Sequence, residues 1–141
     1  MREIKFRGKR IENGEWVKGA YFCLHHNDGR QHIHHFIIPD NTPIPKDKPI
    51  GEIQVEVDPA TVGQHTGKTV KTGPVYQDNI GKSIDGLFLV VWDKEKAAFM
   101  MQFLGGSGER LYLEEMWEDS EIIGNIHDNP ELLEGGPPHA D

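Results

Sequence analysis

Five histidines lie within the eleven residues between positions 25 and 35: His25, His26, His32, His34 and His35. Neutral imidazole is a common ligand of divalent metal ions. His32 and His34 project from the same side of an extended chain because they are two residues apart. A hairpin turn at residues 27–30 would bring His25 close to them. We therefore predict His25, His32 and His34 as candidate metal ligands, and a metal-dependent enzyme is one hypothesis for the chain.

A simpler interpretation of the same histidines is that they are exposed polar residues at the end of a hairpin. No carboxylate follows at the spacing of a His-x-His metal site, and the chain has no pair of cysteines. On this interpretation any divalent metal is captured adventitiously, and the protein has no cofactor.

The segment 63–69, GQHTGKT, mimics the phosphate-binding loop of nucleotide-binding proteins. That loop has four residues between its glycines, whereas three separate Gly63 from Gly67. It also needs a following helix, which Gly73 and Pro74 disfavour. We therefore exclude phosphate-loop chemistry at this segment.

Nucleophiles and acid–base pairs do not occur in a recognisable sequence context. The serines fall in predicted loops, and the acidic residues between 114 and 119 are typical of a solvated surface. The single cysteine, Cys23, excludes an internal disulfide, and its apolar surroundings predict a small core residue. The sequence favours a protein that is not an enzyme.

The net charge of −8 is unevenly distributed. Residues 109–141 hold ten acidic side chains against one basic side chain, Arg110. The first ten residues are basic, with Arg2, Lys5, Arg7, Lys9 and Arg10. We interpret these cations as the solvated face of an edge strand. Two alternatives are a nucleic-acid-binding module and a contact with the acidic end of a neighbouring subunit.

Alternating apolar residues and turn signals predict a mainly β protein. We expect an N-terminal β-meander over residues 1–57, with an Asn-Gly hairpin turn at 12–15 and a Pro-rich surface loop at 39–49. The C-terminal lobe, residues 75–133, is predicted to form a small-barrel-like twisted antiparallel sheet. Its clearest hairpin joins 87–92 to 97–104.

The segment 58–74 is predicted to join the two lobes. Asp58 can cap a helical turn that begins at Pro59, so we expect a short turn at about 58–63. Residues 68–73 are polar and are predicted to form a loop. A second helical turn is expected at about 129–133, and residues 134–141 are expected to be disordered.

The apolar runs are far shorter than the roughly 20 residues of a membrane-spanning helix. No signal-peptide pattern follows the charged start. We therefore expect a protein without membrane contact, located in the cytoplasm.

Three stretches carry a family resemblance. Residues 58–67, DPATVGQHTG, resemble the most recognisable segment of the YopX family of bacteriophage and prophage proteins. The opening (1–11, MREIKFRGKRI, and 13–19, NGEWVKG) and the end (122–133, IIGNIHDNPELL) are similar to that family as well. The resemblance implies a small, β-rich, oligomeric phage protein in the cytoplasm of a bacterial host, and it transfers no catalytic residue. We expect a homo-oligomer that binds a protein partner.

Overall fold

The computed structural model describes residues 4–25, 32–43, 46–47, 49–105, 108–116 and 118–134. The chain divides into two compact units, Met1–Gln64 and His65–Asp141. The division falls inside the segment 58–74 that the sequence identified as a joint. The expected disordered tail lies almost entirely outside the described residues, as does part of the Pro-rich loop.

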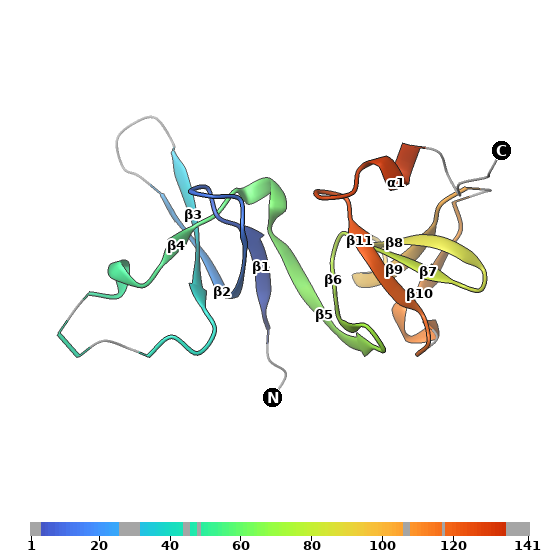
Figure 1. The fold of residues 1–141 in the computed structure, drawn as a ribbon, viewed down its shortest axis with the longest axis horizontal. Helices are drawn as coiled ribbons and strands as arrows, with labels where there is room; N and C mark the ends of the chain where they lie inside the picture. The colour runs from blue at the N-terminus through green and yellow to red at the C-terminus, as the bar shows by residue number, and fades with distance from the viewer. Residues whose placement is uncertain are drawn as a thin grey trace. The chain divides into compact units, whose positions relative to one another are not determined.

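The N-terminal unit is an antiparallel sheet, as the sequence predicted (Figure 1). Its strands lie in the order β4-β3-β2-β1-β5. Their bounds are β1 (Phe6–Lys9), β2 (Trp16–His25), β3 (Ile33–Pro39), β4 (Val55–Glu56) and β5 (Gly63–Val70), of which β5 continues into the second unit. Two short 3-10 turns accompany them, η1 (Ile50–Glu52) and η2 (Pro59–Thr61).

The turn between β1 and β2 follows the predicted Asn-Gly chemistry. Gly14 has a φ of 74°, and its amide donates to the carbonyl of Arg10 at 2.9 Å. The side chain of Asn13 accepts from the amide of Glu15. This local turn sets the register in which Lys9 pairs with Trp16 and Arg7 with Lys18.

One face of this sheet carries the core of the N-terminal unit. Val17, Ile37 and Val57 are buried there, and four half-buried residues pack against them: Phe6, Tyr21, Val55 and Val62. Gly8 lies among these side chains, where an added Cβ would be 3.2 Å from Cγ2 of Val62. The opposite face has no cluster of buried apolar residues among the described residues.

The predicted helical turn after Asp58 is confirmed as η2. The carboxylate of Asp58 accepts from the amide of Ala60 at 3.0 Å. Thr61 at the end of the turn accepts from the amide of Lys9 at 2.8 Å and donates to the carbonyl of Asp58 at 2.6 Å. Its hydroxyl therefore fixes the turn to β1.

The loop predicted for residues 68–73 is wrong for most of its length. Strand β5 runs through Val70 and pairs with β6 (Gly73–Tyr76), with a register shift between His65 and Thr69. Most of its polar side chains are partly or fully exposed. Polar composition therefore reflects contact with water and does not prevent strand pairing.

The C-terminal unit contains a second antiparallel sheet in the order β10-β9-β8-β7-β11 (Figure 1). Its strands are β7 (Asn79–Ser83), β8 (Gly86–Asp93), β9 (Ala98–Phe103), β10 (Arg110–Tyr112) and β11 (Glu121–Asn125). Because β10 and β11 stand at opposite ends of the order, this sheet is not a closed barrel. The 3-10 turn η3 (Leu113–Glu115) and the helix α1 (Glu131–Glu134) complete the unit, and α1 matches the predicted second turn.

A cluster of buried apolar residues packs on one face of the C-terminal sheet. Phe88, Val90 and Met101 come from β8 and β9, and Val75 from β6 covers them. Residues around η3 close the same cluster, with Leu113 and Met116 both buried. Each unit thus has its own apolar core.

Candidate functional site

The register of β2 and β3 separates the three histidines predicted as metal ligands. His25 pairs with Ile33, whereas His34 pairs with Leu24. Directly paired residues of antiparallel strands project from the same face, and neighbouring residues from opposite faces. His25 therefore lies on one face of the hairpin and His34 on the other. The described residues contain no group of three or more His, Cys, Asp or Glu that could hold a metal ion.

His32 and His34 do lie together, with ring centroids 6.3 Å apart. The Nδ1 atom of His34 is 2.8 Å from Oε2 of Glu56, and its ring stacks on Phe36 at 6.2 Å. These contacts link β3 to the short edge strand β4. Metal binding by the three histidines stays a prediction.

Cys23 is exposed, which corrects its prediction as a core residue. Cys23 projects from the same face as Tyr21 and pairs with His35 on β3. The hydroxyl of Tyr21 lies 2.5 Å from Nδ1 of His35. Burial, and then the neighbouring Cys23, raise the pKa of the Tyr21 phenol above its usual value. Tyr21 is the last residue of β2 that packs against the core, and β2 continues beyond it. Cys23 is therefore exposed although its neighbours in the sequence are apolar.

Beyond Phe22 and Phe36 the two strands form what we call the β2–β3 arm, residues 23–25 and 32–34. Leu24 is 50% exposed and Ile33 is 44% exposed. The register places these two side chains on opposite faces of the arm. The arm therefore presents an apolar side chain to solvent on each face.

The face of the N-terminal sheet opposite its core carries a group of cations around a tryptophan. We call it the basic face and define it as Arg7, Lys9, Trp16 and Lys18. The guanidinium of Arg7 lies 4.4 Å from the Trp16 ring centroid and the amine of Lys9 lies 5.4 Å from it. Strand β1 pairs with β2 on one side and with β5 on the other, so its interpretation as an edge strand is wrong.

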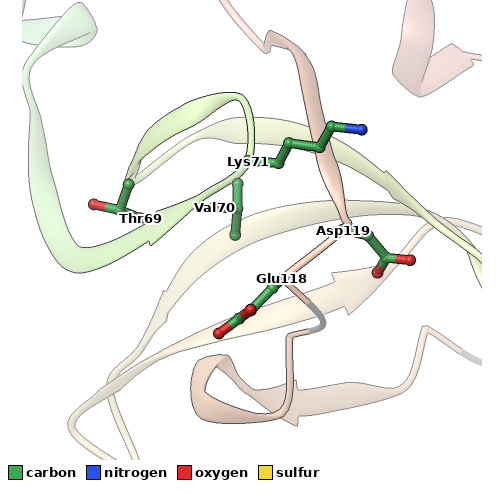
Figure 2. A pocket seen from close by; sticks show the side chains of 5 residues that line it. All are labelled: Thr69, Val70, Lys71, Glu118 and Asp119. Carbon is green, nitrogen blue, oxygen red and sulfur yellow. The ribbon is translucent and has the colours of Figure 1, made fainter.

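The C-terminal unit has an open hollow of about 410 Å³ lined by Thr69, Val70, Lys71, Glu118 and Asp119. Figure 2 shows that the amine of Lys71 and the carboxylate of Glu118 extend in different directions. The backbone amide of Lys71 donates to the carbonyl of Glu118 at 3.2 Å. The hollow therefore lies where two backbone segments are hydrogen-bonded to each other, and the side chains of Lys71 and Glu118 do not converge on a common point in it.

Residues 63–69, which mimic a phosphate loop in sequence, lie within strand β5. Of its glycines, Gly67 adopts a positive φ of 92°. The segment is thus an extended hairpin strand that leads into β6, where a phosphate loop would lead into a helix.

A polar contact that the sequence did not identify connects the segments next to the neighbouring strands β7 and β11. Nε2 of His127 lies 3.2 Å from Oδ2 of Asp78, and both side chains are largely buried. The side chain of Asn125 accepts from the amides of His127 and Asp128. His127, Asn125 and Asp128 lie in the 122–133 stretch that carried the family resemblance, which is the signal that could have found them, whereas Asp78 lies outside it. The network fixes the chain after β11 to the turn before β7.

The family model described as YopX protein matches residues 5–134 of the chain. No curated protein matches the sequence of this chain. Within the described ranges, no helix has the length and apolar character needed to cross a bilayer.

Proposed function

Because the chain belongs to the YopX family, we propose that it is a non-enzymatic homo-oligomer of phage or prophage origin that acts in the host cytoplasm by binding a protein partner. The observation that carries the proposal is the β2–β3 arm, with Leu24 and Ile33 exposed on its two faces. The arm supports self-association for the two reasons that follow.

The first reason is the low intrinsic stability of the arm. A two-stranded hairpin without a covering layer is marginally stable in water. The arm extends beyond the core of its sheet, and Cys23, Leu24, His25, His32 and Ile33 are all exposed. Burial of Leu24 and Ile33 in an interface removes apolar surface from water and holds the two strands together.

The second reason is the distribution of charge, which favours a second copy as the occupant. Residues 1–64 hold nine basic and nine acidic side chains, whereas residues 65–141 hold six basic and fourteen acidic ones. Copies of the C-terminal unit repel one another, but copies of the N-terminal unit carry no net charge. Arms from two copies can cover each other in a self-complementary interface.

Native mass spectrometry of the untagged protein tests the proposal. We expect the wild type to be multimeric at micromolar concentration and the Leu24→Glu/Ile33→Glu variant to associate at least about tenfold more weakly, because each carboxylate would have to be desolvated in the interface. Ile84→Glu is the matched control, since Ile84 is 92% exposed in the other unit. It should leave assembly unchanged.

Two outcomes would contradict the proposal: a monomeric wild type, or a double variant that assembles as the wild type does. Circular dichroism of the variants checks that both remain folded. The same spectra report bound ions, so one stoichiometric ion per chain would favour the metal-dependent alternative.

A further inference from the structure

We propose that the basic face binds single-stranded nucleic acid. This surface is separate from the β2–β3 arm, so the inference goes beyond self-association and does not depend on it. Arg7 and Lys9 come from β1, and Trp16 and Lys18 from β2. Gly8 and Val17, which pair with each other and alternate with these four residues along the strands, face the core. All four side chains therefore project from the opposite face of the sheet.

The cations of the basic face are arranged in a regular array. Arg7 and Lys9 are two residues apart on one strand, a spacing of about 6.6 Å. Lys18 lies directly across from Arg7 on the next strand. Strands β1 and β2 contain no Asp or Glu, so they provide a positively charged path for a chain of phosphates.

Trp16 provides the second part of the recognition surface. Its ring is half-exposed and is held by the guanidinium of Arg7 at 4.4 Å. Proteins that bind single strands combine a basic track with aromatic rings on which bases stack, and arginine planes take part in the stacking. An acidic protein segment would use the cations but not the ring.

Strand β1 lies inside the sheet, and Lys18, across from Arg7 on β2, is exposed. Since β2 and β5 flank β1, the cations stand on a sheet face and not at a strand edge. A base can stack on Trp16 when it is unpaired, whereas a duplex keeps its bases inside. The basic face therefore fits a single strand better than a duplex.

Fluorescence polarisation with a labelled 20-nucleotide oligothymidylate tests the inference on the full chain. We expect salt-dependent binding with a slope of log K against log salt of about −2, which corresponds to three neutralised phosphates. Arg7→Gln/Lys18→Gln should weaken binding at least about tenfold and reduce the slope by more than about 1. Trp16→Leu should weaken binding about fivefold and leave the slope unchanged, because stacking releases no counterions.

The matched control is Lys94→Gln/Lys96→Gln in the C-terminal unit. Lys96 also lies over an aromatic ring, 5.7 Å from the centroid of Tyr112, but on the acidic unit. This variant should bind like the wild type. Because Arg7 packs on Trp16, Lys18→Gln alone serves as a second variant at an exposed position and should weaken binding about threefold.

Several results would overturn the inference. They are no binding at 50 mM salt, equal losses in the control and the Arg7/Lys18 variants, or tighter binding of a peptide with the acidic sequence of residues 109–121. Equal affinity for a duplex of the same length would also contradict it. The Leu24→Glu/Ile33→Glu variant should still bind the oligonucleotide, so a failure of self-association and a failure of nucleic-acid binding can be told apart.

Discussion

Gly81 of β7 lies directly beneath the ring of Phe88 on β8, so closely that a Cβ on Gly81 would be 2.2 Å from Cζ of that ring. Phe88 is fully buried at the centre of the C-terminal core. The two residues are paired in the ladder, and the absence of a side chain on one makes room for the ring of the other.

Gly81→Ala should therefore destabilise the protein by about 1–3 kcal/mol, because the added methyl group forces Phe88 out of its place in a packed core. Urea unfolding followed by tryptophan fluorescence measures the change. Gly51→Ala is the control, since nothing lies within 4 Å of its added Cβ. Equal stability of Gly81→Ala and the wild type would show that the core has room for the ring to move.

Asp93 connects the β8–β9 turn to β10. Its carboxylate accepts from the amide of Lys96 at 3.0 Å and from Nη1 of Arg110 at 2.9 Å. These two contacts, the first being the larger, lower the pKa of Asp93 below its usual value. The ionised carboxylate is therefore favoured by folding.

The stabilisation by Asp93 should be present above its unfolded-state pKa of about 3.9 and disappear as the pH falls through the lower folded-state pKa. Asp93→Asn should lower the Tm at pH 7, and the difference from the wild type should close toward pH 3. Thermal unfolding between pH 3 and pH 7 measures it. Asp85→Asn, at an exposed carboxylate in the β7–β8 turn, should show no such difference. A gap that stays constant across this range would contradict the assignment.

Local chemistry explains which parts of this fold could be predicted from the sequence. The cap at Asp58 and the Asn13-Gly14 turn involve residues within four positions of one another, and both are as expected. The family resemblance is also confirmed, because it depends on residue order alone.

Long-range register explains what could not be predicted. Alternation shows that His32 and His34 share a face, but the pairing of His25 with Ile33 depends on how β2 and β3 align, and it places His25 on the other face. Similarly, the apolar residues next to Cys23 in the sequence predict that it is buried. Whether a position of β2 is covered depends on where the other strands of the sheet end, which the local sequence does not show. The cations of β1 predicted an edge strand because the pairing of β1 with β5 joins residues almost 60 positions apart, which the local sequence does not reveal.

Thr61 shows how a single hydroxyl can secure such a distant contact. It accepts from the amide of Lys9, 52 positions away in the sequence, and is buried. Thr61→Val keeps the shape of the side chain but leaves that amide without its acceptor, so it should cost about 1–3 kcal/mol of stability in urea unfolding. Thr69→Val, at an exposed position of β5, should change stability by less than about 0.5 kcal/mol. A neutral Thr61→Val would show that the turn is held to β1 by apolar packing.

Cys23 reports directly on the environment of the β2–β3 arm. In a single chain its thiol is exposed next to Leu24, so an isolated subunit should react readily with a thiol reagent such as DTNB. If copies of the chain cover the arm as proposed, the wild-type oligomer should react at least about tenfold more slowly than the Leu24→Glu/Ile33→Glu variant, because access to the thiol follows dissociation. Stopped-flow absorbance at several protein concentrations measures this, with Ile84→Glu expected to match the wild type. Equal rates for the wild type and the arm variant at all concentrations would place the interface elsewhere on the chain.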